Sequence, residues 1–179
     1  MSRVTEPGTF ENYPRRVPLS PGAEAPSFEL PAADGGAPRS LDDLTAVGPA
    51  LLVFFKTGCP TCQLAFPVYA ELERRYGDSV PVVAVSQDAL AKAVPWLEDE
   101  GFAGVVLDDA SGGYAVSDSY AVRSVPTLVL VDEGMVVATS EAWDRDRANA
   151  WAQQLGEATG RYVSPVSREG DGLPAFKPG

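Results

Sequence analysis

The feature that most constrains the fold is a continuous apolar run, residues 50–55, that leads directly toward the only two cysteines of the chain. Six consecutive apolar residues rich in strand formers are typical of a central strand covered on both faces. The cysteines follow in the sequence Cys59-Pro60-Thr61-Cys62. Proline suits the first position of a helix, where its missing N–H would have no intrahelical partner. The stretch therefore predicts a buried strand, a short turn and a helix that begins at the cysteine pair.

The spacing of the cysteines fits a thiol pair that works by disulfide exchange. Residues three apart are neighbours on a helix surface, so Cys59 and Cys62 can close a small disulfide. Cys59 would lie at the helix N-terminus, where free N–H groups and the macrodipole favour the reactive thiolate. Cys62, one turn further in, would be more shielded. We therefore expect Cys59 to attack a disulfide and Cys62 to resolve the mixed disulfide.

Three other interpretations of the cysteine pair compete with a redox role. A structural zinc site needs about four Cys or His ligands, and this chain has two cysteines and no histidine. Only a metal shared between chains would meet that need. A purely structural disulfide would close a very small loop, and its entropic stabilisation grows with loop length. Two inert cysteines buried in a core helix are the third interpretation. We expect a redox pair, with no metal and no cofactor.

Length and charge narrow the class of protein. A chain of 179 residues with 45% hydrophobic content suits one globular domain with extensions. The formal net charge of −11 argues against nucleic acid and anionic membrane partners, which attract basic patches. The N-terminal stretch lacks an apolar segment behind a basic one, and no apolar run could span a bilayer. We expect a cytoplasmic protein, where thiols are kept reduced and a Cys-x-x-Cys pair is catalytic more often than structural.

The order of strand and helix signals predicts an α/β fold, a three-layer α/β/α sandwich around a central mixed sheet. The expected elements are a hairpin (27–30 with 38–40), a helix capped by Ser40 (41–44), a strand (50–55), the cysteine helix (to 76), a strand (80–85), a helix begun by residues 86–88, a strand (105–107), a short helix (112–121), a hairpin (127–131 with 135–138) and a last helix capped by Asp144. Residues 1–20 predict an extended or disordered segment, residues 21–160 the domain, and residues 161–179 a loose C-terminal tail, because that tail carries several prolines and glycines and few large apolar residues.

Four segments carry a family resemblance. Residues 21–30 look like an N-terminal hairpin opening, residues 54–62 match a strand with its active-site motif, Pro67 stands at a helix kink, and residues 120–127 match a segment that holds a cis-proline. Together they make residues 21–158 resemble the thioredoxin superfamily, in particular the TlpA-like thiol–disulfide oxidoreductases of the redoxin (AhpC/TSA-related) branch. The resemblance implies a thioredoxin-like sandwich with an N-terminal β-hairpin extension.

The resemblance also implies roles for individual residues. Cys59 would be the nucleophile, Cys62 the resolving thiol, and Pro126 a cis-proline that lets the Val125 backbone pair with an extended substrate. Thr61 would either donate a hydrogen bond to the Cys59 thiolate or face solvent. An apolar collar around the sulfur, able to receive an extended peptide, would be formed by Gly58, Pro60, Val125 and Pro126, and Thr61 is a further expected substrate-binding residue. The implied partners are a disulfide-containing protein or small thiol substrate and an external reductant.

Two positions depart from the family pattern. Gly58 stands where many relatives carry tryptophan, and Val53 stands where thioredoxins carry a buried aspartate, so that Cys62 lacks an obvious proton acceptor. The favoured function is a thiol–disulfide oxidoreductase acting as a reductase. A peroxiredoxin-like thiol peroxidase is the alternative, although Leu52 and Lys56 occupy the Pro and Thr positions of its Pro-x-x-x-Thr-x-x-Cys motif. A third possibility is a non-catalytic thioredoxin-fold binding or chaperone module.

Overall fold

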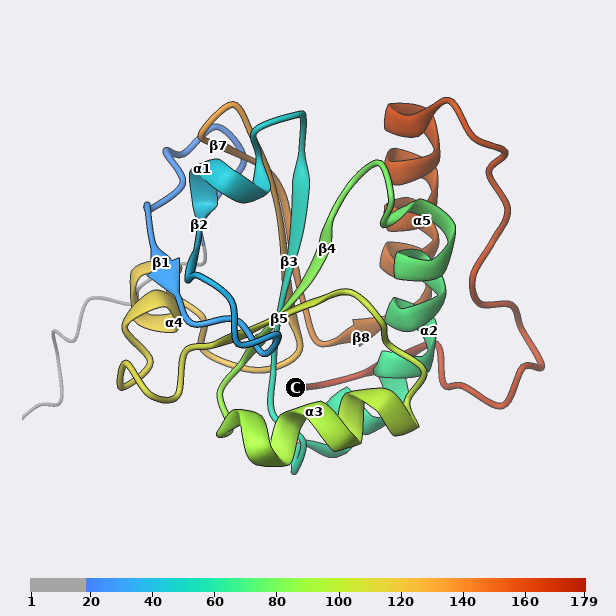
Figure 1. Ribbon diagram of the computed structural model, residues 1–179. Helices are drawn as coiled ribbons and strands as arrows, with labels where there is room; N and C mark the ends of the chain where they lie inside the picture. The colour runs from blue at the N-terminus through green and yellow to red at the C-terminus, as the bar shows by residue number, and fades with distance from the viewer. Residues whose placement is uncertain (1–18) are drawn as a thin grey trace, which may run out of the picture.

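A five-stranded mixed sheet forms the centre of the protein, which we describe from a computed structural model for residues 19–179 (Figure 1). The strand order is β5-β4-β3-β6-β7. The strands β3, β4 and β5 run parallel, and β6 and β7 complete the sheet in antiparallel pairings. Their bounds are Ala50–Phe55 (β3), Val82–Ser86 (β4), Val105–Asp108 (β5), Thr127–Asp132 (β6) and Met135–Glu141 (β7). The predicted α/β sandwich around a mixed sheet is confirmed.

The central strand is buried on both faces, as its unbroken apolar sequence predicts. All six residues of β3 are inaccessible to solvent. Neighbouring side chains point to opposite faces of the sheet. Phe54 packs against Tyr120 with ring centroids 5.5 Å apart, whereas Phe55 packs against Phe66 with centroids 4.7 Å apart. The sheet therefore has an apolar layer on each side.

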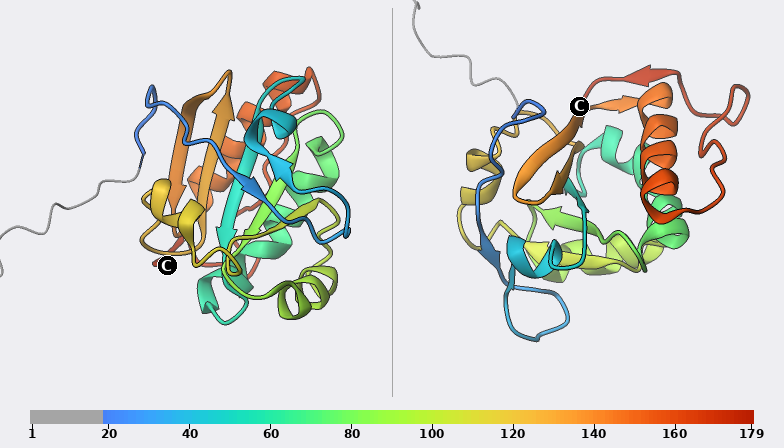
Figure 2. Two further views of the ribbon diagram at one scale, coloured as in Figure 1. Left: turned by 60° about the vertical axis from the view of Figure 1, so that its left-hand side comes forward. Right: turned by 90° about the horizontal axis from the view of Figure 1, so that it is seen from above.

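Three helices cover the face to which Phe55 points: α2 (Pro60–Tyr76), α3 (Leu90–Asp99) and α5 (Arg145–Thr159) (Figure 2). Trp96 of α3 stacks on Phe55 at 5.5 Å and meets Phe66 of α2 edge-on at 4.9 Å. The helix α5 packs beside α2, and its Trp151 donates a hydrogen bond from Nε1 to Ser140 Oγ on β7. This aromatic cluster fixes α2, and with it the cysteine pair, against the sheet.

The opposite face carries the N-terminal hairpin of β1 (Glu29–Leu30) and β2 (Arg39–Ser40), followed by α1 (Leu41–Leu44) and α4 (Ala115–Ser119). Ser40 caps α1 through a reciprocal pair of hydrogen bonds with Asp43, as its position before the helix predicts. Tyr120 joins α4 to the hairpin region, because its hydroxyl donates to the Pro26 carbonyl at 2.9 Å. The expected N-terminal β-hairpin extension is therefore present.

Several predicted element boundaries differ from the structure: the hairpin strands are shorter than expected, the helix expected over residues 112–121 covers only Ala115–Ser119, and the strand expected over residues 135–138 extends to Glu141. The strand expected over residues 80–85 begins later, at Val82, directly after Pro81. The helix expected to begin at residues 86–88 starts at Leu90, and its N-cap Ala89 provides no side-chain hydrogen bond. The reason is that the Asp88 carboxylate binds Thr57 at the end of the neighbouring strand instead of capping its own helix.

The C-terminal segment is held against the domain, in contrast to the loose tail expected for residues 161–179. Its strand β9 (Phe176–Lys177) pairs antiparallel with β8 (Trp143–Asp144). Asn149 on α5 accepts from the backbone N–H groups of Val166 and Ser167 and donates to the Ser167 carbonyl. Polar side chains therefore hold this segment in place, together with Val166 and Leu173, which pack against the hydrophobic core. The residues expected to form an extended N-terminal segment lie, up to residue 18, outside the described part of the chain.

Candidate active site

Cys59 occupies the N-cap position of α2, at the end of the turn that follows β3. Its backbone is extended (φ −83°, ψ 118°), and its Sγ accepts a hydrogen bond from the Cys62 backbone N–H at 3.4 Å. The side chain is partly exposed. A sulfur that caps a helix N-terminus faces free N–H groups and the positive end of the helix dipole, both of which stabilise a thiolate. The residue thus has the two properties of an attacking thiol, access and anion stabilisation.

Cys62 lies one turn further along α2 and is completely buried. Both cysteines are free thiols in this structure. Burial raises the pKa of the Cys62 thiol far above its ordinary value, a hydrogen bond from the Lys56 backbone opposes the rise, and interactions with Cys59 and with the Asp88 carboxylate add to it. Cys62 is therefore a protonated thiol at neutral pH, shielded from substrates.

The turn between β3 and α2 is held by a carboxylate from the neighbouring strand end. Asp88 Oδ2 accepts from Thr57 N at 2.7 Å and from Thr57 Oγ1 at 3.0 Å, and Oδ1 accepts from Lys92 Nζ at 2.9 Å. Burial alone would raise the pKa of Asp88, but the hydrogen bonds from Lys92 and Thr57 outweigh it and lower the pKa below its usual value. Sequence reasoning missed this residue. A signal was present, because β3 and β4 are parallel neighbours and the residues that follow them meet at one edge.

The segment before β6 forms the second wall of the site. The Val125–Pro126 peptide bond is cis. The Cys59 thiol donates to the Val125 carbonyl oxygen at 3.1 Å. Next to it, Thr127 Oγ1 donates to the Ser124 carbonyl at 2.7 Å, which ties this bend to the sheet. The structure therefore brings together the cysteine motif and Val125-Pro126, which are more than sixty residues apart in the sequence.

The remaining expected site residues differ in their environment. Pro60 is exposed at the first position of α2. Gly58 is exposed, and a Cβ placed on it would meet nothing within 4 Å. Thr61 follows neither of its expected alternatives, because it is buried and its hydroxyl donates to the Pro178 carbonyl at 2.5 Å instead of to Cys59 or solvent. The last residues of the chain thus reach the site, which composition gave no reason to expect.

A hollow of about 260 Å³ lies next to Val125, which is one of its lining residues. Two cationic residues line it, Lys56 and Arg123. The Lys56 ammonium lies 5.4 Å from the centroid of the Tyr114 ring, in cation–π geometry. The Asp118 carboxylate lines the same hollow, so this side of the candidate active site carries charges of both signs.

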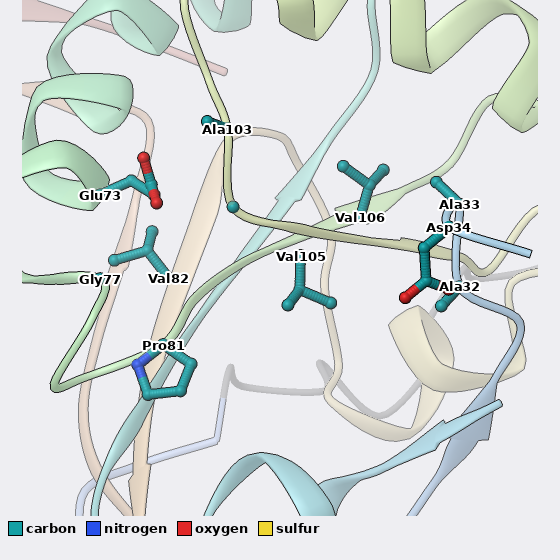
Figure 3. Close-up of a pocket in the computed structure, with 11 residues that line it drawn as sticks. Ala32, Ala33, Asp34, Glu73, Gly77, Pro81, Val82, Ala103, Val105 and Val106 are labelled. Carbon is teal, nitrogen blue, oxygen red and sulfur yellow. The ribbon is translucent and has the colours of Figure 1, made fainter. Parts of the chain in front are cut away.

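A second cavity, of about 410 Å³, lies at the β5 edge of the sheet and does not include the cysteines (Figure 3). Two carboxylates, Asp34 and Glu73, stand on opposite sides of it, and Asp34 is paired with Arg39 at 2.9 Å. The other lining residues are small or apolar: Ala32, Ala33, Gly77, Pro81, Val82, Ala103, Gly104, Val105 and Val106. The cavity offers no nucleophile and no cluster of titratable groups.

Residues 19–179 contain neither a metal-binding cluster nor a membrane-spanning helix. Within that range no group of three or more His, Cys, Asp or Glu side chains is placed to hold a metal ion. No helix in the same range has the length and apolar character needed to cross a membrane.

A Cys-x-x-Cys pair at the N-terminus of a helix, facing the segment before β6 on a mixed sheet of this topology, defines the class of thioredoxin-like thiol–disulfide oxidoreductases. The comparisons with known proteins agree. The chain belongs to the AhpC/TSA family, whose model matches residues 21–140.

Individual relatives and solved structures support the same class of protein. The thioredoxin-like protein YneN of Bacillus subtilis is 29% identical over 135 residues, which cover 72% of this chain and 75% of that protein. The thioredoxin of the same organism is 29% identical over 102 residues, which cover 57% of this chain and 76% of that thioredoxin. A crystal structure from Chlorobium tepidum, assigned as a thiol:disulfide interchange protein DsbE, superposes with a TM-score of 0.68 at 27% identity and covers 78% of this chain and 98% of that chain. The protein is thus an oxidoreductase with thiol redox chemistry.

Proposed function

We propose that the protein reduces disulfides by dithiol–disulfide exchange through Cys59 and Cys62. The Cys59 thiolate attacks one sulfur of the substrate disulfide, forms a new S–S bond to it and expels the other substrate sulfur as a thiolate, which takes up a proton. Cys62 then loses its proton and attacks the Cys59 sulfur, which releases the second substrate thiolate. Two electrons pass from the enzyme dithiol to the substrate, and an external dithiol reductant restores the pair. The substrate class is a disulfide-containing protein or small molecule.

The observation that carries this proposal is the asymmetry of the two thiols. Cys59 is partly exposed, caps α2 and lies 3.1 Å from the Val125 carbonyl, whereas Cys62 is buried one turn away. Exchange needs one sulfur that meets the substrate and a second that is reserved for the intramolecular step. The high pKa of Cys62 fits the reserved role, because a protonated thiol does not compete for the substrate.

The test separates the two thiols by substitution. The Cys62→Ser variant should form a mixed disulfide with a model substrate such as oxidised glutathione, and the adduct should persist, whereas Cys59→Ser should form no adduct. Intact-mass analysis after acid quenching detects the adduct. In the unmodified protein, a redox titration read by thiol alkylation should show a two-electron transition near the thioredoxin range, about −270 mV. If no Cys59–Cys62 disulfide forms at any redox potential of the buffer, the proposal is refuted.

A thiol peroxidase is the second candidate, because the match to the AhpC/TSA family does not distinguish it from a disulfide reductase. In that reaction the Cys59 thiolate would attack a peroxide oxygen to give a sulfenic acid, water or an alcohol would leave, and Cys62 would close the disulfide with loss of water. The residues at the peroxidatic motif positions are Leu52 and Lys56 instead of Pro and Thr. We expect hydrogen peroxide to oxidise the dithiol more slowly than a disulfide does, in a stopped-flow comparison at equal concentrations.

The non-catalytic interpretation and the compartment are addressed by the same measurements. A binding module would keep its function in a variant with both cysteines changed to serine, whereas a reductase would lose all activity. The cytoplasmic location expected from the sequence is part of the proposal. A reduction potential near that of thioredoxin suits net reduction in that compartment, and a potential near −120 mV would indicate an oxidant instead.

A further inference from the structure

The last residues of the chain lie on the candidate active site. Figures 1 and 2 mark this end, C, at the edge of the sheet where α2 begins. On one side the Pro178 carbonyl accepts the hydroxyl of Thr61, the residue that separates Pro60 from Cys62 in the motif. On the other side Gly179 lies against Ser124 and Val125. The segment therefore touches both walls of the site.

The contact at Gly179 is close. A Cβ added to Gly179 would come within 2.7 Å of the Val125 carbonyl oxygen and 3.1 Å of Ser124 Cβ. That carbonyl oxygen is the atom to which the Cys59 thiol donates. The same oxygen atom is therefore close to both the attacking sulfur and Gly179, and only glycine fits there without displacement.

The preceding residues are bound through their backbone. Trp143 Nε1 donates to the Pro174 carbonyl at 2.8 Å, and the backbone N–H of Arg145 donates to the Ala175 carbonyl at 2.9 Å. The strand β9 then adds to the edge formed by β8. An extended segment that adds to a strand edge by main-chain hydrogen bonds is a known mode of peptide binding, β-augmentation.

We propose that residues 174–179 are an intramolecular ligand of a polypeptide-binding groove, and that a protein disulfide reaches Cys59 by replacing them. The groove is formed by the β8 edge, Thr61 and the Ser124–Val125 backbone. This inference rests on the proposed disulfide reductase activity and adds its substrate class, an extended polypeptide. The donors that hold the segment are Trp143 Nε1, Arg145 N and Thr61 Oγ1, and they recognise backbone carbonyls of any sequence.

Residues 174–179 are mostly exposed to solvent and can be displaced at low free energy. Of residues 174–179 only Lys177 is even partly buried, and the Phe176 side chain is 58% exposed. Segments with few buried apolar contacts and exposed backbone hydrogen bonds open at low free energy. The segment therefore competes with a substrate polypeptide without closing the site permanently.

The experiment compares the full chain with a variant that lacks residues 174–179, using two substrates. Insulin is the protein disulfide, and oxidised glutathione is the small disulfide. If the segment leaves the groove free in about one molecule in ten, its removal should raise kcat/KM for insulin roughly tenfold, because apparent affinity scales with the competent fraction. The value of kcat/KM for oxidised glutathione should change less than twofold, because this small disulfide contacts little of the groove. The peptide Pro-Ala-Phe-Lys-Pro-Gly, added to the shortened variant, should inhibit insulin reduction, and a scrambled peptide should not.

A point variant keeps the test valid if the shortened chain folds poorly. Gly179→Val places side-chain atoms against the Val125 carbonyl and should displace the end of the segment, with a rise in insulin reduction in the same direction. Glu169→Gln, at an exposed position before the segment, is the control and should not change insulin reduction. Equal rates for insulin in all variants, with glutathione reduced normally, would overturn the groove proposal alone. Failure of every variant, including the full chain, to reduce either disulfide would overturn the proposed function.

Discussion

Replacing Asp88 with alanine removes the carboxylate that holds the turn before Cys59. In the structure Asp88 Oδ2 accepts from both the backbone N–H and the hydroxyl of Thr57, at 2.7 and 3.0 Å. The Asp88 side chain is only 19% exposed, so water replaces these bonds poorly. Hydrogen bonds to a charged group contribute about 1.5–3 kcal/mol each, and the half-exposed pair with Lys92 adds less than 1 kcal/mol. We expect Asp88→Ala to lower the free energy of unfolding by about 3 kcal/mol.

Urea unfolding at neutral pH, followed by tryptophan fluorescence, measures this loss. The midpoint should fall while the slope m stays constant, since the exposed surface on unfolding is unchanged. Asp88→Asn is the matched control, because it keeps an acceptor oxygen for Thr57 but loses the charge. We expect it to cost about half as much. Thr57→Val removes the hydroxyl alone and should show a coupling of about 1 kcal/mol with Asp88→Ala in a double-mutant cycle.

The pH dependence of the stability provides a second test of the role of Asp88, because the direction of the change can be predicted. The pKa of Asp88 is lowered in the folded protein, so its carboxylate stabilises the fold above the unfolded pKa of about 3.9 and loses this effect as the pH falls through the folded pKa. The difference between the unmodified protein and Asp88→Asn should therefore be constant from pH 5 to 7 and shrink below pH 4. A loss under 0.5 kcal/mol for Asp88→Ala, or a difference that grows on acidification, would refute the assigned role.

Three further predictions concern the packing and the thiols. Phe66→Ala, in the buried aromatic cluster, should cost about 3–5 kcal/mol in urea unfolding; a cost near 1 kcal/mol would contradict the packing. Gly104→Ala should cost about 1–3 kcal/mol, because its Cβ would lie 2.5 Å from the Val82 carbonyl oxygen, whereas Gly58→Ala, with open space around it, should change stability by less than 0.5 kcal/mol. Because the pKa of Cys62 is raised, resolution of the mixed disulfide should accelerate about tenfold per pH unit between pH 6 and 9, measured by quenched mass analysis; a rate independent of pH would show that Cys62 deprotonation is not involved.

The sheet and its helices were predictable because their information is local. The unbroken apolar run of β3 and the alternating strand and helix signals are set by burial, which the sequence records directly. The boundary at residues 86–88 was wrong for a non-local reason, since Asp88 serves the turn after β3 instead of its own helix. A capping residue and a carboxylate bound across the sheet have the same local sequence pattern.

The site was predictable to the extent that it depends on the cysteine spacing and the family resemblance. The contacts of Thr61 and of the final residues were not, because a segment held by side-chain hydrogen bonds to its backbone has no apolar periodicity. Asn149 and Trp143 supply those bonds from α5 and β8, far from the segment in the sequence. Composition alone therefore described residues 161–179 as loose.

The fluorescence of the buried Trp143 can report whether residues 174–179 occupy the groove. Its indole N–H is bonded to the Pro174 carbonyl and its ring is inaccessible to solvent. When the segment leaves the groove, that N–H is released to water, and the emission of the indole should shift to longer wavelength. With Trp96 and Trp151 replaced by phenylalanine, a single emission band would follow occupancy of the groove during turnover without any added dye.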